Sequence, residues 1–555
     1  MTNSMDSTEE KEEHYKGWPN SHGFDPDFEV LEPVELQITG KIPQYAAGTL
    51  YRTGPGKRQV QADNGKVYTI DHWFDGFNQV HRFQIVSENG TIRAYYNSRM
   101  TVDNILQNIR RTGRLDGFTF AQKNDPCQSY FQKFQSLFFP ATPPTPDDEK
   151  SSRNVGVTVA ISMPGLSNSD GDKQKTSFLT LKTDATQMSR IHPETLEPIG
   201  LATQALLHPD LTGPLSAAHC KSDPVTGDIY NYNLDIGSSC TYRIFHVSAR
   251  TGETRILAKF TGAGAYIHSL FLTADHVILC VWNSHYSMGG LKMLWEKNIL
   301  DAIGDYDPSK PATWYVIHRR EGGLLATYES PAFFSFHSVN AWVETKGGSS
   351  YIVAELAAYD NLDMLKRVYY ENLMSNGKVA KSSGDQMANS ARSTLRRYRL
   401  PAVPTSTNLK SKSKAKRIAV VEWTAPYDVS PELPTLNPNF LTIPHRYTYG
   451  IIDRAKSSLY DGLVKYDSLT KEAKYWEEFG HTPGEAIFIP DPNSKEEDGG
   501  VLLSVVFDGI NDHSYLICLD ARTMTELGRA DVRGVVGFGF HGAFAPAVGS
   551  AQPQV

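Results

Sequence analysis

The chain has 555 residues, of which 40% are apolar and 21% charged, and its formal net charge is −7. This composition predicts a globular protein with ample material for a core, and the negative balance argues against a nucleic-acid partner. The five cysteines are sparse and lack CxxC spacing, which predicts a reducing compartment and no disulfide framework.

The amino-terminal residues are polar and acidic, and we expect residues 1–30 to form a tail. They contain no apolar stretch of the kind that signal peptides carry. The chain also has no run of roughly 18 apolar residues, the length that a membrane-spanning helix needs. We therefore expect a cytoplasmic protein that is either free or bound peripherally to a membrane.

Short runs rich in β-branched and aromatic residues predict strands along most of the chain. The clearest runs are residues 179–182, 276–282, 351–356, 417–423, 501–507 and 515–520. Turns of one type lie between such runs, each led by Asp, Ser or His and each containing a Thr. These turns begin at His192, Asp223, Ser248, Asp467 and Asp520. Their irregular spacing favours an all-β propeller with diverged blades over an array of fixed period.

The domain organisation is simple. Residues 375–416 are rich in Ser, Lys, Arg and Asn and predict a long, partly mobile insertion. Residues 546–555 have the composition of a tail. Since no linker separates two cores, we predict one β-propeller domain over residues 31–545.

Four histidines lie between small or apolar residues in stretches that predict buried strand ends: His219, His268, His337 and His541. A buried neutral imidazole needs partners for both ring nitrogens. For any one of them, a core histidine satisfied by its neighbours is the ordinary interpretation. Four such residues, spread over most of the chain, instead suggest one shared metal ion. A propeller makes this feasible, because inner strands of distant blades meet at its axis.

The residues around these histidines resemble those of the carotenoid cleavage oxygenases, a non-heme iron family that includes stilbene-cleaving oxygenases and retinoid isomerases. The matching stretches are 48–56, 71–83, 223–233, 336–342, 484–492, 497–509, 514–530 and 537–542. The resemblance implies a seven-bladed β-propeller with a cap of loops and helices over the axial face that carries the iron. The amino-acid sequence of the chain most resembles that of the fungal carotenoid oxygenases, in particular the torulene-cleaving branch.

The resemblance also implies the ligands of the metal. Fe(II) is expected on His219, His268, His337 and His541, which leaves coordination positions open for O₂. Carboxylates are expected to hold the second ring nitrogens, and the matching positions are Asp184, Glu432 and Glu485. The family has Glu at all three. Asp184 is one methylene shorter, so it would reach its histidine through water or leave it unanchored. The alternative for all three is an ordinary surface or turn role.

The implied activity is an Fe(II)-dependent dioxygenase reaction that cleaves one C=C bond of a carotenoid, such as torulene or an apocarotenoid, into aldehydes. An apolar polyene and O₂ would be its partners, and we infer no obligate protein partner. The absence of a catalytic Ser/His/Asp or Cys/His group is no objection, because this chemistry needs no general acid–base pair.

A membrane contact is expected in residues 124–139. If this segment is a helix, four apolar side chains share one face, and Gln and Lys lie opposite. The four are Phe131, Phe134, Leu137 and Phe138, and Arg110, Arg111 and Arg114 precede them. Such a stripe is often core, but the family has a membrane-touching patch here, so we expect shallow insertion into a bilayer surface. Cys127 is a weak candidate for acylation.

Three other functions stay open. Stilbene-cleaving relatives carry a Lys directly before the carboxylate that matches Asp184, whereas this chain has Thr183 there. Lys182 lies one residue earlier and should face the other way on a strand. A polyene isomerase that uses the metal without O₂ is compatible with the same ligands. A partner-binding propeller with a non-functional metal site is disfavoured, because all four histidines are present.

Overall fold

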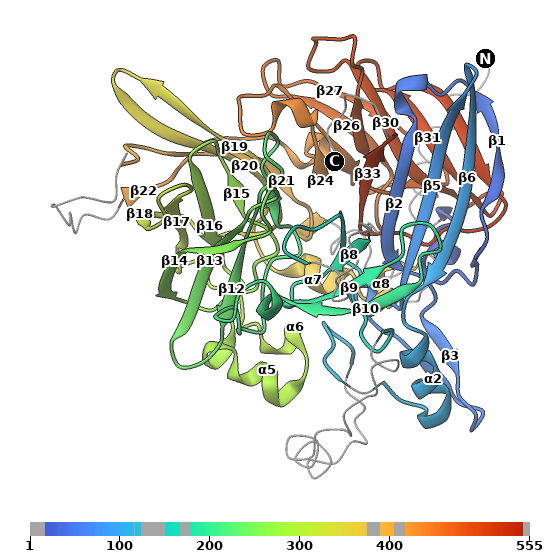
Figure 1. Ribbon diagram of the computed structural model, residues 1–555, viewed down its shortest axis with the longest axis horizontal. Coiled ribbons are helices and arrows are strands. Elements are labelled where there is room, and N and C mark those ends of the chain that lie inside the picture. The colour runs from blue at the N-terminus through green and yellow to red at the C-terminus, as the bar shows by residue number, and fades with distance from the viewer. Residues whose placement is uncertain are drawn as a thin grey trace, which may run out of the picture.

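The computed structural model describes residues 17–115, 117–123, 150–166, 178–374, 389–404 and 417–547. These residues form an all-β fold, as the sequence predicted. Five sheets of four or five strands follow one another along the chain, and a ten-stranded sheet joins the two ends. Figure 1 shows the sheets arranged around the middle of the molecule, which is the arrangement of a propeller.

The five smaller sheets are built from strands that are mostly consecutive. The first contains β7 (Thr158–Ile161), β8 (Leu179–Lys182), β9 (Gln187–Ile191) and β10 (Pro198–Thr203). The second contains β11 (Lys221–Ser222), β12 (Ile229–Asp235), β13 (Cys240–Val247) and β14 (Thr254–Gly262). The third contains β15 (Phe271–Leu272), β16 (His276–Val281), β17 (Ala312–His318), β18 (Leu324–Ser330) and β22 (Arg417–Ile418). The fourth contains β19 (Phe334–Lys346), β20 (Ser349–Tyr359), β21 (Thr394–Leu400) and β23 (Val420–Thr424). The fifth contains β24 (Glu432–Thr435), β25 (Tyr447–Ile452), β26 (Gly462–Asp467) and β27 (Ala473–Trp476).

The ten-stranded sheet closes the ring. Its order is β28-β30-β31-β32-β1-β6-β5-β2-β33, and β29 pairs with β30. The strands from the start of the chain are β1 (Val34–Gly40), β2 (Gly48–Pro55), β5 (Asn78–Glu88) and β6 (Thr91–Met100). Those from its end are β28 (His481–Pro483), β29 (Ile487–Pro490), β30 (Gly500–Asp508), β31 (His513–Asp520), β32 (Glu526–Val532) and β33 (His541–Pro546). β3 (Gln59–Gln61) and β4 (Val67–Thr69) form a separate hairpin.

The helices are short. They are α2 (Asp103–Thr112), α5 (Leu291–Glu296), α6 (Ile299–Ala302), α7 (Asp363–Arg367) and α8 (Tyr370–Leu373). Turns of 3-10 helix are η1 (Ser21–Phe24), η2 (Gln44–Ala46), η3 (Trp73–Asp75), η4 (Gln204–Leu206), η5 (Ser287–Gly290), η6 (Tyr427–Val429) and η7 (Pro438–Phe440). Among the described residues, no helix is both long and apolar enough to cross a bilayer.

The repeated turns of the sequence are hairpin turns, as predicted. Asp223 stands between β11 and β12, and its Oδ1 accepts the backbone N–H groups of the second and third residues after it, each at 2.7 Å. The other four leading side chains bind following N–H groups in a related way: His192, Ser248, Asp467 and Asp520. Each therefore reverses the chain between neighbouring strands of one sheet.

Two predicted boundaries are wrong. The described part of the expected 1–30 tail belongs to the domain, because Trp18 and Phe24 are only 2% and 1% exposed. The expected insertion over 375–416 contains β21, which pairs with both β20 and β23. Charged residues between the buried Leu395 and Leu400 hid the alternating pattern of this strand.

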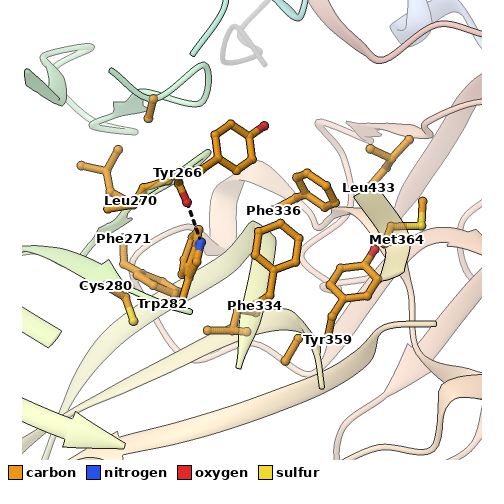
Figure 2. Packing of buried hydrophobic residues seen from close by; sticks show 14 of the residues in the cluster. Tyr266, Leu270, Phe271, Cys280, Trp282, Phe334, Phe336, Tyr359, Met364 and Leu433 are labelled. Carbon is orange, nitrogen blue, oxygen red and sulfur yellow. Dashed lines mark hydrogen bonds between the residues drawn. The ribbon is translucent and has the colours of Figure 1, made fainter. Parts of the chain in front are cut away.

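The largest buried cluster supports the chain next to two of the four histidines, His268 before β15 and His337 in β19. Figure 2 shows Tyr266, Trp282, Phe334, Phe336 and Tyr359 packed together within it. The Trp282 indole N–H donates to the backbone oxygen of Tyr266 at 3.0 Å, which ties the segment before β15 to the end of β16. The chain next to His268 and His337 is thus held in a dense aromatic core.

Candidate metal centre

The four histidines named from the sequence lie together. His219 precedes β11, His268 precedes β15, His337 lies in β19 and His541 begins β33, so each comes from a different sheet. One nitrogen of each ring lies within 4.8 Å of the corresponding nitrogens of the others. The Nε2 atom of His541 is 2.9 Å from Nε2 of His219 and 3.3 Å from Nε2 of His337.

Local strand geometry aims these rings inward. The backbone N–H of His219 donates to the oxygen of His268 at 3.1 Å, and His219 forms a parallel bridge with Ser269. The pairing of β19 with β20 shifts register on both sides of Ser338, next to His337. Such bulges turn side chains that regular pleating would direct elsewhere. His541 is paired with Thr53 of β2, where the last strand meets the first part of the chain.

Asp184 holds His268. The His268 Nδ1–H donates to Asp184 Oδ2 at 2.8 Å, and the Tyr266 hydroxyl donates to the same oxygen at 2.8 Å. The other carboxylate oxygen accepts the backbone N–H of Ala218 at 3.0 Å. The shorter side chain therefore reaches its histidine directly, and the expectations of a bridging water or an unanchored ring are wrong.

Glu432 holds His337 in the same manner. The His337 Nδ1–H donates to Glu432 Oε2 at 2.7 Å. The Tyr359 hydroxyl donates to the other oxygen at 2.6 Å, and the backbone N–H of Leu433 also binds the carboxylate. Glu432 is 6% exposed, so these contacts replace water as its hydrogen-bond partners.

Glu485 holds His541. The His541 Nδ1–H donates to Glu485 Oε1 at 2.7 Å. The second oxygen accepts the backbone N–H of Gly542 at 2.7 Å and Nη1 of Arg52 at 3.0 Å. Arg52 is 2% exposed, which makes this a buried ion pair. The carboxylate is thus anchored by a cation where the other two are anchored by a tyrosine.

His219 is positioned differently. Within the described part of the chain, it is the one histidine of the four without a carboxylate on its ring. Its placement comes from the backbone, through its own N–H bond to His268 and through the bond from Ala218 to Asp184. Asp184 therefore restrains two of the four histidines.

Burial disfavours protonation of His219 and His541. Desolvation and then the neighbouring rings hold the pKa of His219 well below its usual value. Desolvation also lowers the pKa of His541 to about 4, against the opposing influence of Glu485. Burial opposes ionisation of Glu432 and Glu485, but the adjacent histidines and the hydrogen-bond donors hold the pKa of each below its usual value. Glu432 and Glu485 therefore stay charged, and His219 and His541 stay neutral, at neutral pH.

This donor set fits a metal ion. Since each carboxylate can only accept, it fixes the proton on Nδ1 of its histidine and leaves Nε2 as a lone pair. The Nε2 atoms of His337 and His541, whose protons the carboxylates place on Nδ1, face each other at 3.3 Å, and their lone pairs repel unless a cation lies between them. Ligand nitrogens about 2.1 Å from one ion lie about 3.0–3.4 Å apart in octahedral or tetrahedral geometry, which agrees with the 2.9 and 3.3 Å separations.

Two different surfaces surround the histidines. On one side, five aromatic side chains contact one another near the rings: Phe74, Phe120, Tyr266, Phe336 and Phe540. We call this set the aromatic wall. On another side is a cavity of about 160 Å³ that His219, His337 and His541 line together with Lys221 and Leu433. A space of this size holds a few small molecules but not a large ligand, which needs about 300 Å³ or more.

The remaining residues singled out in the sequence do not contact the four histidines in the described part of the chain or lie outside it. The ammonium of Lys182 donates to Cys220 Sγ at 2.8 Å, and the side chain is 7% exposed. The stripe Phe131, Phe134, Leu137 and Phe138, and with it Cys127, lies outside the described residues.

Sequence reasoning missed Arg52, Tyr266 and Tyr359, the side chains that anchor the three carboxylates. Tyr266 had a detectable signal, because it precedes His268 by two residues and so shares its side of an extended chain. Arg52 contacts Glu485, which is 433 positions away, and Tyr359 contacts Glu432, which is 73 positions away. No local pattern predicts such contacts.

Comparison with known proteins identifies the family. The sequence model described as retinal pigment epithelial membrane protein matches residues 23–546. The carotenoid dioxygenase of Neurospora crassa is 39% identical, over 96% of this chain and 92% of that protein. The torulene dioxygenase of Fusarium fujikuroi is 40% identical, over 96% of this chain and 95% of that protein. The chain therefore belongs to the retinal pigment epithelial membrane protein family of carotenoid oxygenases, which confirms the resemblance seen in its motifs.

Solved structures agree on the fold. A variant of the Synechocystis apocarotenoid oxygenase matches with a TM-score of 0.73 and 20% identity, over 96% of this chain and 100% of that chain. The cobalt-substituted form of that oxygenase matches with a TM-score of 0.70 over 96% of this chain. At this identity the similarity supports the propeller-like architecture alone.

Proposed function

We propose that the protein is an Fe(II)-dependent dioxygenase that cleaves a C=C bond of a carotenoid with O₂ and releases two carbonyl products. The convergence of four histidines, three of them oriented by buried carboxylates, carries this proposal. Fungal relatives named carotenoid dioxygenase and torulene dioxygenase, at about 40% identity over nearly the whole chain, support the reaction and the substrate class.

The chain's own residues prepare the site. Asp184, Glu432 and Glu485 present the Nε2 lone pairs of three histidines toward one point. Iron, when bound there, supplies the redox-active centre at which O₂ reacts with an electron-rich double bond. The reaction adds one oxygen atom to each carbon of that bond, so no proton has to be moved by a side chain.

The aromatic wall supplies an apolar surface beside the metal ligands. The rings of Phe336 and His268 are 5.7 Å apart, and Phe74 packs against Phe336 at 5.8 Å. Phe74 and Phe540 are partly exposed, so they keep surface free for a ligand. Flat rings that exclude water suit a conjugated chain, and they position one of its double bonds near the centre.

The substrate we propose is torulene or a related carotenoid. The name of the Fusarium relative supports torulene. Lys182 is engaged with Cys220, and this contact gives no support to the stilbene alternative.

We also infer the finer architecture. The ten-stranded sheet divides at β1, whose first part pairs with β6 and whose second part pairs with β32. If each half counts as one blade, the propeller has seven blades in one domain. The short helices α5 to α8 and the loops around η3 would then form the cap over the metal-bearing face.

Peripheral membrane binding at a cytoplasmic surface is a further part of the proposal. Phe118, six residues before the segment with the expected stripe, is 58% exposed, and Met288 and Leu291 are 74% and 44% exposed. The N–H of Thr119 donates to the oxygen of Lys297 at 2.9 Å, so the chain next to Phe118 runs beside the end of α5. Exposed apolar residues gathered this way favour a bilayer surface.

Vesicle binding tests the membrane proposal. Phe118→Ser, combined with Ser at Phe131 and Phe134, should reduce co-sedimentation with phospholipid vesicles. Leu469→Ser is the control, because Leu469 is 72% exposed in a turn elsewhere. Equal binding by all variants would refute the proposed contact.

The reaction is tested by aerobic incubation of the Fe(II)-loaded protein with torulene, β-carotene, β-apo-8′-carotenal and resveratrol. Products are identified by chromatography and mass spectrometry. We expect O₂-dependent aldehydes from torulene or a related carotenoid, and none from His268→Ala or His541→Ala. Cleavage of resveratrol alone would move the protein to the stilbene branch, and isomerisation without O₂ uptake would replace the dioxygenase proposal.

A further inference from the structure

The anchoring of His268 differs from that of the other two carboxylate-held histidines. Glu432 accepts the hydrogen bonds of His337 and Tyr359 on different carboxylate oxygens. Asp184 receives the His268 Nδ1–H and the Tyr266 hydroxyl on the same oxygen, Oδ2, at 2.8 Å each. The three groups therefore converge on one point, and the Tyr266 oxygen lies 3.3 Å from the ring nitrogen of His268.

The backbone explains why an aspartate reaches the ring. Residues Asp184 to Thr186 run beside the segment that leads to His219. The N–H of Ser216 donates to the oxygen of Asp184 at 2.9 Å, and Ala185 forms an antiparallel bridge with Leu215. These contacts bring the backbone of Asp184 so close to His268 that the short aspartate side chain is long enough to contact the ring.

Tyr266 is equally fixed. Its backbone oxygen accepts the indole N–H of Trp282 and the hydroxyl of Ser284, and its own N–H donates to the oxygen of Ser284. Its ring packs against Phe120 at 5.4 Å, and it lies in the cluster drawn in Figure 2. With a 2% exposed side chain, it has no freedom to make room for a longer neighbour.

We propose that Tyr266 is a positioning residue and that it forms one size-matched unit with Asp184. The hydroxyl occupies the space next to His268 that a longer carboxylate needs, and it donates the hydrogen bond that holds the short carboxylate in place. Through Oδ2 the unit orients His268, and through the Ala218 N–H it also steadies the segment before His219. The inference rests on the proposed metal centre and adds a residue to it.

The size match has a measurable consequence. Asp184→Glu lengthens the side chain by about 1.5 Å, the length of one carbon–carbon bond. No gap exists for it, because Oδ2 already contacts both partners at 2.8 Å. Tyr266→Phe removes one oxygen from the same place. Each single change should therefore displace His268, and the two together should compensate.

The experiment is a double-mutant cycle on the full-length protein with cobalt(II) as the probe. Affinity for cobalt is measured by competition with a chelator, and the absorption spectrum of bound cobalt reports ligand geometry. We expect Asp184→Glu and Tyr266→Phe each to weaken affinity by about 10- to 100-fold, the usual effect of losing a group that orients a ligand. The double variant should bind cobalt more tightly than Asp184→Glu alone and regain the wild-type spectrum.

Tyr370→Phe is the matched control. Tyr370 is 1% exposed in the same core, and within the described residues its hydroxyl has no hydrogen-bond partner. Removing that hydroxyl should leave cobalt affinity and spectrum unchanged. An effect equal to that of Tyr266→Phe would overturn the inference, because it would show a general response of the core.

The outcomes separate this inference from the proposed function. The inference alone is overturned if the wild-type protein loads metal and cleaves carotenoid, but the effects of the two single substitutions on cobalt affinity simply add in the double variant. It is also overturned if Asp184→Glu binds cobalt as tightly as the wild type. A wild-type protein that binds no cobalt overturns both. If Asp184→Glu does not fold, recovery of soluble, cobalt-binding protein in the double variant supports the size match, and failure to recover overturns it.

Discussion

Glu432→Gln should weaken metal binding through the orientation of His337. The carboxylate accepts the His337 Nδ1–H at 2.7 Å and the Tyr359 hydroxyl at 2.6 Å. An amide offers one acceptor oxygen, so one of these donors would face an NH₂ group instead. A hydrogen bond to a charged group contributes about 1.5–3 kcal/mol. Since about 1.4 kcal/mol is a factor of ten, we expect metal affinity to fall by about 10- to 100-fold.

The assay is chelator competition on the purified protein, together with thermal unfolding of the metal-free form. Glu344→Gln is the control, because Glu344 also accepts two side-chain donors, the indole N–H of Trp342 and the hydroxyl of Tyr351, both at 2.8 Å. It lies outside the centre, so its loss should leave metal affinity unchanged. Wild-type affinity in Glu432→Gln, or an equal loss in Glu344→Gln, would refute the reasoning.

Three other perturbations test the structure around the centre. Arg52→Met should lower the free energy of unfolding of the metal-free protein by about 3–5 kcal/mol, because it leaves Glu485 buried without its cation; an unchanged denaturant midpoint would contradict this. Gly509→Ala should lower the melting temperature, since its Cβ would lie 1.6 Å from the backbone oxygen of Pro19, whereas Gly237→Ala, with nothing within 4 Å, should melt like the wild type. Removing the metal with a chelator should lower stability by about 2.7 kcal/mol relative to a hundredfold excess of metal over its Kd; identical melting curves with and without metal would count against the site.

The sequence predicted the parts of the fold that depend on residues close together along the chain. The alternating strand runs and the Asp-led turns, such as the one at Asp223, depend on neighbours a few residues away. The described end of the expected tail was mispredicted because Trp18 is buried by a contact with Thr482, 464 positions along the chain. Strand β21 was missed because the partly buried arginines in it resemble loop composition.

In the metal centre, too, only the features that depend on nearby residues or on known motifs could be predicted. The four histidines could be named because each has small or apolar neighbours, and the carboxylates could be named because motifs mark them. The residues that complete the site could not, since Arg52 and Tyr359 act across sheets. The direct contact of Asp184 was also beyond reach, because it depends on how closely two backbone segments approach. The shorter side chain of Asp184, considered alone, led to the wrong expectation that it would not contact His268 directly.

Closure of the ring and assembly of the centre depend on the same residues. Thr53 of β2 pairs with His541 of β33, and the neighbouring Arg52 holds the carboxylate that orients this histidine. If β33 separates from β2, the centre loses one ligand and the anchor of that ligand in a single step. A bound ion therefore opposes local opening at this seam, in addition to stabilising the fold as a whole.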